Sequence, residues 1–443
     1  METARSFETI AAAATKRVRE SLDLVRDTRV GRLLARIGIA PKAASSESLL
    51  DLAGALLSLR GRASGPSLAS AFFDLYEASD APSRHGFLEH LHQLYPRDTA
   101  AIDKAITEWQ QDHDDAAAER LRQATESPCR RLIRQLNLAP SGTRRLIAMR
   151  ADLLGQKMTP GLKALDRDFA YLFETWFNAG FLELRRIDWN SPAAILERII
   201  AYEAVHFIDG WDDLRRRMAP ADRRCYGFFH PQMADDPLIF VEVALTDTLP
   251  SAIRQIIAED RVMIDPHQAS SAIFYSISNC QEGLRGIPFG NFLIKQVASL
   301  LKRELPHLQH FATLSPVPGF AKSLPHQAGN ADGTGLGDAD LRALAARFIV
   351  QQRNQKGQVA DSVARFHLGN GARLEAVHAG ADLSAKGQRE SHGVMVNYLY
   401  DLNAIEANLF ALSELGTVAH SVAVQELLEP SAEKRKRRTA KSD

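Results

Sequence analysis

The stretch that decides the fold starts with Ala272-Ile-Phe-Tyr-Ser-Ile-Ser278, followed by the turn Gln281-Glu-Gly-Leu-Arg-Gly-Ile-Pro-Phe-Gly290 and the segment Asn291 to Glu304. The first part is rich in β-branched and aromatic residues and predicts a strand. The third part carries apolar residues at helical spacing and predicts an amphipathic helix, which Pro306 ends. A strand that runs through glycines into a helix N-terminus offers backbone N–H groups to an anion. This order therefore predicts a site for a phosphate-bearing ligand.

Three glycines of this turn, Gly283, Gly286 and Gly290, let the backbone approach a ligand without a Cβ atom in the way. Arg285 adds a cation that can pair with phosphate. No Lys-Ser or Lys-Thr follows the glycines, so this is not a Walker-type nucleotide loop. The spacing also differs from the dinucleotide-binding fingerprint. A coenzyme A pyrophosphate on a single strand–turn–helix unit fits better, and a purely structural turn is the alternative.

Length and charge bound the class of protein. A chain of 443 residues is long enough for two domains. Lys plus Arg (54) equals Asp plus Glu (54), so no overall field favours nucleic acid. The tail Lys434-Arg-Lys-Arg-Arg438 is basic, and we expect residues 431–443 to be a solvated, disordered terminus.

Cysteine usage and the N-terminus indicate the compartment. The three cysteines have no paired spacing for zinc or for a redox motif, which suggests a reducing environment. The N-terminal residues lack the apolar core of a signal peptide, and no stretch is long enough for a membrane helix. We therefore expect a cytoplasmic protein with no membrane partner.

Residues 1 to about 185 predict helices throughout. Runs such as Leu49 to Leu57 and Phe169 to Phe177 recur at helical period, as do residues 33–39. Turn-forming stretches separate them, at 64–66, 81–83, 139–142 and 159–161. This pattern predicts a bundle of roughly seven to nine short helices. A group of arginines in this part is expected to form a solvated face; its members are Arg130, Arg131, Arg134, Arg144, Arg145 and Arg150.

The second half changes period. After a helix at 193–204, strands are predicted at 225–230 and 238–245, and the second is apolar enough to be central. A helix is expected from Asp338 to about Gln352, after a glycine-rich loop. Further strands are predicted at 364–368, 372–378 and 393–400, before a closing helix at 405–415. The C-terminal half is therefore predicted to be a mixed sheet with helices, an α+β domain.

Two side chains are candidates for chemistry. Ser315 lies on a segment stiffened by Pro316 and Pro318, which holds its hydroxyl in place, although a serine before a proline is also a common plain turn residue. It has no Gly-x-Ser-x-Gly context, which argues against an ordinary hydrolase nucleophile. His367 is expected on a short strand that enters a Gly-Asn-Gly turn, where its near-neutral pKa suits proton transfer. A hydrogen-bonded core histidine is the alternative.

Several segments in order closely resemble malonyl-CoA decarboxylase. They are Phe228-Phe-His-Pro231, Ala272 to Ser278, Gly283 to Lys295, Leu314 to Phe320, Arg365 to Ala372, Ala381 to Gly387 and Val394 to Tyr398. The resemblance is collinear from about residue 190 to 412, and the helical N-terminal half fits the same family. The chain departs from animal members at Pro288, where they have a glutamate, so no carboxylate role carries over to this position. It also lacks their mitochondrial leader and peroxisomal ending, which points to a bacterial form.

The resemblance implies a helical oligomerisation domain at 1–186 and a catalytic domain with the acetyltransferase-like (GNAT) fold at 187–430. The family's catalytic serine and histidine fall on Ser315 and His367. Its malonyl-CoA-binding stretch falls on Arg285, Gly286, Ile287, Pro288, Phe289, Gly290 and Asn291. The implied partners are the substrate malonyl-CoA and further copies of the chain in a homotetramer or other homo-oligomer.

The implied reaction releases carbon dioxide and leaves an enolate whose charge rests on the thioester oxygen. The thioester is the electron sink, so we expect no metal, biotin or pyridoxal phosphate. Ser315 is assigned to hydrogen-bonding the substrate and relaying the proton, and His367 to donating it, while the sequence leaves the reverse assignment open. An acyl-CoA N-acyltransferase on the same fold and a non-catalytic acyl-CoA sensor are the alternatives.

Overall fold

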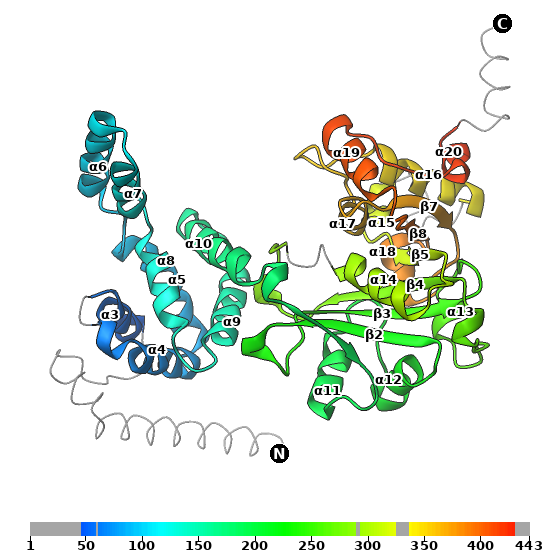
Figure 1. Cartoon of the computed structure of the whole chain (residues 1–443), viewed down its shortest axis with the longest axis horizontal. Helices are drawn as coiled ribbons and strands as arrows, with labels where there is room; N and C mark the ends of the chain where they lie inside the picture. The colour runs from blue at the N-terminus through cyan, green and yellow to red at the C-terminus, as the bar shows by residue number, and fades with distance from the viewer. Residues whose placement is uncertain (1–45, 59–60, 289–292, 325–335, 430–443) are drawn as a thin grey trace, which may run out of the picture. The chain divides into compact units, whose positions relative to one another are not determined.

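The computed structural model describes residues 46–58, 61–288, 293–324 and 336–429 (Figure 1). The chain divides into two compact units. The first contains the residues up to Phe181 together with two short segments, His230–Ala234 and Gln281–Pro288. The second contains Leu182–Phe229, Asp235–Cys280 and the residues from Phe289 on.

The first unit is built from helices. They are α3 (Ser46–Leu57), α4 (Gly61–Ala78), α5 (Ala81–Leu94), α6 (Thr99–Asp112), α7 (Asp115–Ala124), α8 (Pro128–Leu136), α9 (Gly142–Leu154) and α10 (Pro160–Trp176). Side-chain oxygens of Asp80, Asp98, Asp114 and Thr159 cap α5, α6, α7 and α10. Phe72, Phe87 and Phe173 are among the fully buried side chains of its core.

Helices begin at three of the predicted turn-forming stretches, 81–83, 139–142 and 159–161: α5 starts at Ala81, α9 at Gly142 and α10 at Pro160. The break at residues 64–66 is wrong, because α4 runs through Pro66. Pro66 is the sixth residue of α4, past its first turn, and the helix continues although the proline donates no backbone hydrogen bond. The predicted helical run at 33–39 lies outside the described residues, and the role of this part in oligomerisation stays a prediction.

The second unit is built on one mixed sheet. Its strands are β1 (Glu183–Ile187), β2 (Arg223–Phe229), β3 (Ile239–Thr246), β4 (Ser271–Asn279), β5 (His310–Thr313), β6 (Ser315–Pro316), β7 (Arg373–His378) and β8 (Met395–Leu399). The order is β1-β2-β3-β4-β5-β8-β6, with β7 also paired to β8. The β4–β5 pair is parallel, and the other pairs are antiparallel.

Helices pack on both faces of this sheet. Helices α11 (Ala193–Tyr202) and α12 (Gly210–Met218) share a core with β2 and β3, and Figure 1 shows both beside these strands. A second core joins α13 (Arg254–Ile257) to β4, β5 and β8. The remaining helices are α14 (Leu293–Glu304), α15 (Phe320–Ser323), α16 (Asp338–Gln351), α17 (Ser362–Leu368), α18 (Ala385–Ser391), α19 (Ile405–Leu415) and α20 (Val422–Leu428).

The predicted fold class, an all-helical region followed by an α+β domain with a mixed sheet, is confirmed. Helix α14 connects the only parallel strand pair of the described residues, as a parallel crossover requires.

Two further local predictions are wrong. Residues 183–187 form β1 rather than the end of the helical region, because they pair with β2 along their whole length. Residues 364–368 form the end of α17 rather than a strand. The Asp361 side chain caps this helix by accepting a hydrogen bond from the Ala364 N–H at 2.9 Å, and a short apolar run cannot by itself distinguish a helix from a strand.

Candidate functional site

Ser315 lies where β5 ends and the chain turns into β6. It pairs with Val396 of β8, and its side chain is 5% exposed. Its Oγ donates a hydrogen bond to Thr313 Oγ1 at 2.9 Å. The hydroxyl is therefore held on the sheet and withdrawn from bulk water.

His367 lies on α17 and meets Ser315 directly. Its Nε2 is 3.2 Å from Ser315 Oγ, and the residue is 3% exposed. The other ring nitrogen, Nδ1, is 2.9 Å from the hydroxyl of Tyr400, which follows β8. The structure thus brings together the two candidates named from the sequence and adds a third polar residue.

Burial sets the protonation state of this group. It lowers the pKa of His367 to about 3, so the imidazole is neutral at physiological pH. It also raises the pKa of Tyr400 well above its usual value, so the phenol keeps its proton. A protonated phenol donates to Nδ1, which leaves the single ring N–H on Nε2 to donate to Ser315. The chain of donors then runs from Tyr400 through His367 and Ser315 to Thr313.

Neighbouring groups fix this chain of hydrogen bonds. The ring of Tyr398 stacks on His367 with centroids 4.8 Å apart at 23°, and its backbone N–H donates to Thr313 Oγ1 at 3.2 Å. Asn397 Nδ2 donates to the carbonyl of Thr313 at 2.9 Å. The site is therefore held by β5, β8 and α17 together.

Asp361 connects the serine segment to the histidine helix. One carboxylate oxygen caps α17, and the other accepts the Gly319 N–H at 3.0 Å. Burial raises the pKa of this carboxyl group, and its backbone hydrogen bonds oppose that rise. Asp361 thus sets the position of His367 relative to the Ser315–Gly319 segment.

The predicted anion turn belongs to the first unit, whereas Ser315 and His367 belong to the second. Arg285 is exposed and pairs with Glu282. Gly286 adopts φ +83°, a left-handed conformation that favours glycine, while Ile287 is buried and Pro288 exposed. The remaining predicted turn residues, Phe289, Gly290 and Asn291, lie outside the described residues.

Two expectations about this turn are corrected. A Cβ atom on Gly283 would lie 1.9 Å from the Ile147 carbonyl oxygen, so packing against α9 explains this glycine. Arg150 was expected on a solvated face but is 3% exposed. Its Nη1 donates to the carbonyls of Gly283 at 2.7 Å and Arg285 at 3.0 Å, and its Nε donates to Asp166. A buried arginine therefore fixes the shape of the turn.

The sheet opens beside Ser315. Strands β4 and β5 pair from Ser271↔His310 to Phe274↔Thr313. Beyond Phe274, β4 continues to Asn279, and in the described residues its only strand partner there is β3. The segment after β5 turns into β6, which pairs with β8. The edge of β4 beyond Phe274 therefore has no paired strand on the side where β5 ended, at the level of Ser315.

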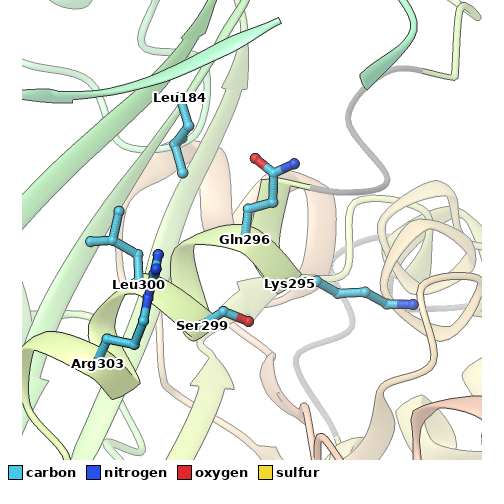
Figure 2. A pocket seen from close by; sticks show the side chains of 6 residues that line it. All are labelled: Leu184, Lys295, Gln296, Ser299, Leu300 and Arg303. Atoms are coloured by element: carbon cyan, nitrogen blue, oxygen red, sulfur yellow. The ribbon is translucent and has the colours of Figure 1, made fainter. Parts of the chain in front are cut away.

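A separate pocket of about 380 Å³ lies along α14 (Figure 2). It is lined by Leu184 of β1 and by Lys295, Gln296, Ser299, Leu300 and Arg303 of α14. Ser315 and His367 are not among its lining residues, so this pocket is not the place where the hydrogen-bonded pair lies.

The sequence argument missed Tyr400, Thr313 and Asp361. Tyr400 ended the strand predicted at 393–400. The only signal that could have marked it as a functional residue was the presence of polar residues in that apolar strand. Thr313 gave no signal, because its contact with Ser315 depends on the turn from β5 into β6. Asp361 precedes a predicted strand that is in fact a helix, so its capping role was hidden.

Comparisons with known proteins agree on one family. A family model described as the malonyl-CoA decarboxylase C-terminal domain matches residues 180–344 and 337–438, and one for the N-terminal domain matches residues 95–177. The mitochondrial malonyl-CoA decarboxylase of Rattus norvegicus is 33% identical over 351 residues, which cover 68% of this chain and 70% of that protein.

Solved structures give the same result. The crystal structure of malonyl-CoA decarboxylase from Rhodopseudomonas palustris is 48% identical, with a TM-score of 0.79, covering 86% of this chain and 99% of that one. The structure from Agrobacterium vitis is 47% identical, with a TM-score of 0.81, covering 86% of this chain and 100% of that one.

Proposed function

This chain belongs to the malonyl-CoA decarboxylase family, and from that premise we propose that it converts malonyl-CoA to acetyl-CoA and carbon dioxide with Ser315 and His367 as its catalytic pair. It is accordingly a carboxy-lyase. One observation carries the assignment of the pair: two polar side chains far apart in the sequence share a buried hydrogen bond of 3.2 Å. The resemblance selects the same two residues.

The reaction breaks the bond between C2 of the malonyl group and its carboxylate. Carbon dioxide leaves, and the bonding electrons pass into the thioester as an enolate. C2 then takes up one proton to give acetyl-CoA. Because the thioester accepts the electrons, the proposal requires no metal or organic cofactor beyond the coenzyme A of the substrate.

Ser315 is proposed to donate a hydrogen bond to the malonyl carboxylate or to the thioester oxygen. Its hydroxyl now donates to Thr313, and a rotation about one side-chain bond redirects it. A donor placed at a developing oxyanion is typically worth about 3–4 kcal/mol in the transition state. The dry surroundings of Ser315 favour such an interaction, because water does not compete for it.

His367 is proposed to deliver the proton as a neutral imidazole. It gives up the proton on Nε2, directly or through the Ser315 hydroxyl, while Nδ1 receives the phenol proton of Tyr400. Solvent then restores the Tyr400 proton, so the net proton comes from water. General-acid delivery of this kind typically contributes a factor of about 10²–10⁴. The opposite order, with Ser315 as the direct donor, uses the same contacts.

The pyrophosphate of coenzyme A is assigned to the predicted turn, as the resemblance implies. Backbone N–H groups of the 285–291 turn, in which Pro288 has none, would hold the pyrophosphate, with Arg285 as a cation beside it. The thioester arm would pass along β4 beyond Phe274, the edge that lies next to Ser315. Extended ligands bind such edges through backbone hydrogen bonds.

The test is to mix the purified protein with malonyl-CoA alone, without metal or amine, and to follow acetyl-CoA and carbon dioxide. One-to-one formation of both supports the proposal. If malonyl-CoA binds and stays intact, the proposal fails and an acyl-CoA sensor takes its place. If turnover requires an added amine, the protein is an N-acyltransferase.

Assembly and location form a further part of the proposal. The helical first unit is proposed to build a homotetramer or other homo-oligomer, which sedimentation of the purified protein tests. In the described part of the chain, no helix has both the length and the apolar character that a membrane span needs. The cytoplasmic location stays a prediction, and fractionation of the source cells tests it.

A further inference from the structure

The segment between α11 and α12 is fixed to the sheet by the half-buried carboxylate of Glu203. Glu203 Oε1 accepts the backbone N–H groups of Val205 at 2.8 Å and His206 at 2.7 Å. Its oxygens also accept the hydroxyls of Ser276, at 2.7 and 2.8 Å, and Ser278, at 3.1 Å. The position of His206 is therefore set by β4.

A buried arginine holds the same segment from the other side. Arg217 Nη1 donates to the carbonyl of His206 at 2.8 Å, and Nη2 donates to that of Phe207 at 2.8 Å. The guanidinium is itself paired with Asp213 at 2.9 Å. Because both flanks are anchored by charge-assisted hydrogen bonds, the backbone of His206 is rigid.

The side chain of His206 is buried and only partly satisfied. It is 8% exposed, and its ring lies 6.5 Å from the ring of Tyr275. The ring atom Nε2 has no hydrogen-bond partner among the described residues. A buried polar atom without a partner destabilises the fold, which calls for an explanation.

The charge state of His206 decides what that nitrogen can bind. Burial lowers its pKa to about 4, and the cations of Arg217 and Lys386 reinforce this effect while Asp382 opposes it. The imidazole is therefore neutral at physiological pH. A neutral imidazole carries one N–H and one lone pair, and with the proton on Nδ1 the lone pair lies on Nε2. Such an atom accepts a hydrogen bond and repels a carboxylate or an enolate oxygen.

The location of His206 connects it to the proposed substrate path. Tyr275 is the first residue of β4 beyond the last β5 pair, Phe274↔Thr313. It is also an extra residue in the ladder, since Glu242 pairs with Ser276 while Val243 pairs with Phe274. His206 thus lies beside the point where β4 is no longer paired with β5. Ser315 follows shortly after the last paired residue of β5, Thr313.

We propose that Nε2 of His206 accepts a hydrogen bond from an amide N–H of the pantetheine arm of the acyl-CoA substrate. The inference rests on the proposed function. It names the class of ligand that His206 contacts, which is an acyl thioester of a thiol that contains an amide group. His206 is then a substrate-positioning residue and takes no part in the bond-breaking step. An amide N–H satisfies the lone pair, which the acidic end of the substrate cannot do.

The test compares His206→Phe, which keeps a ring and removes the lone pair, with His206→Gln, which keeps an acceptor oxygen. We expect His206→Phe to raise the Kd for acetyl-CoA about 5- to 10-fold in calorimetry, as for the loss of one hydrogen bond, and His206→Gln to restore most of the affinity. His310→Phe, an exposed position on β5, is the matched control. Thermal melts verify that each variant is folded.

Truncated substrates separate positioning from chemistry. His206→Phe should lower kcat/KM for the malonyl thioester of N-acetylcysteamine, which retains an amide, and leave the malonyl thioester of pentanethiol unaffected. Equal losses with both thioesters, or an unchanged Kd for acetyl-CoA, would overturn the inference. Binding of acetyl-CoA does not require turnover. A wild-type protein that binds it without decarboxylating malonyl-CoA therefore contradicts the proposed function alone.

Discussion

The Nε2 atom of His367 lies 3.2 Å from Oγ of Ser315, although 52 positions separate the two residues in the chain. One residue comes from the turn between β5 and β6 and the other from α17, and Asp361 bonds to both segments. Two buried polar side chains placed in contact by separate elements are typical of a functional site. Their contact is between side chains and satisfies no backbone hydrogen-bonding group of either residue.

Replacing His367 by Asn should remove proton delivery and leave the fold intact. We expect kcat for malonyl-CoA decarboxylation to fall about 10²–10⁴-fold, with the Kd for acetyl-CoA changed less than about threefold. His392→Asn is the matched control, because His392 adopts a left-handed conformation that Asn tolerates. A comparable loss of acetyl-CoA binding in His367→Asn would mean that the residue serves binding.

Replacing Ser315 by Ala should remove the hydrogen-bond donor to the substrate. The expected loss in kcat is about 10²–10³-fold, the usual effect of deleting one oxyanion donor. Steady-state kinetics measure it, and Ser413→Ala on the exposed face of α19 serves as the control. Retained turnover in Ser315→Ala would remove the serine from the mechanism.

Tyr400→Phe should weaken catalysis less than the two preceding variants. The substitution keeps the ring and deletes the hydroxyl that lies 2.9 Å from Nδ1 of His367. Without that donor the neutral imidazole loses a stabilising bond, so the pKa of His367 rises and the acid limb of the kcat profile moves to higher pH. A pH–rate series measures the shift. An unchanged profile would show that the phenol does not act through the histidine.

Buried titratable groups predict how stability depends on pH. In the folded protein the pKa of His367 is about 3, below its ordinary 6.5. Its contribution to the free energy of unfolding is therefore fully present above pH 6.5 and is lost as the pH falls from 6.5 through 3. Glu242 behaves in the opposite way. Burial raises its pKa from 4.5 to about 8, so its contribution is present below pH 4.5 and is lost as the pH rises through 8.

Glu242→Gln isolates the second effect, because Gln has the shape of a protonated Glu. Between pH 6.5 and 8 the wild-type free energy of unfolding should fall by up to about 1.4 kcal/mol per pH unit, and the variant should be flatter. Denaturant unfolding at several pH values measures both slopes. Parallel slopes would show that Glu242 is ionised in the folded protein.

Gly283→Ala tests the packing of the predicted anion turn. The added Cβ atom would meet the Ile147 carbonyl oxygen at 1.9 Å, so we expect a loss of about 3 kcal/mol in the free energy of unfolding. Gly337→Ala is the control, since a Cβ atom there meets nothing within 4 Å. Equal stability of the two variants would contradict the packing explanation for Gly283.

The sequence was sufficient to predict the helices and strands with a strong hydrophobic period and to name Ser315 and His367 as candidate site residues. The strand at 272–278 and the helix that follows it are confirmed, because β-branched residues and helical spacing are local properties. His367 was placed on the wrong element, since five residues of mixed character fit a strand as well as a helix. The contacts of Tyr400 and Arg150 depend on tertiary packing, which leaves no local pattern to detect.

The most direct test of the central claim is a double-mutant cycle on Ser315 and His367. Decarboxylation of malonyl-CoA is measured for wild type, Ser315→Ala, His367→Asn and the double variant, with acetyl-CoA affinity as the check on binding. If the two residues act as one hydrogen-bonded unit, the double variant should lose no more kcat than the more damaging single variant. Losses that multiply would show that the residues act independently and would contradict the account.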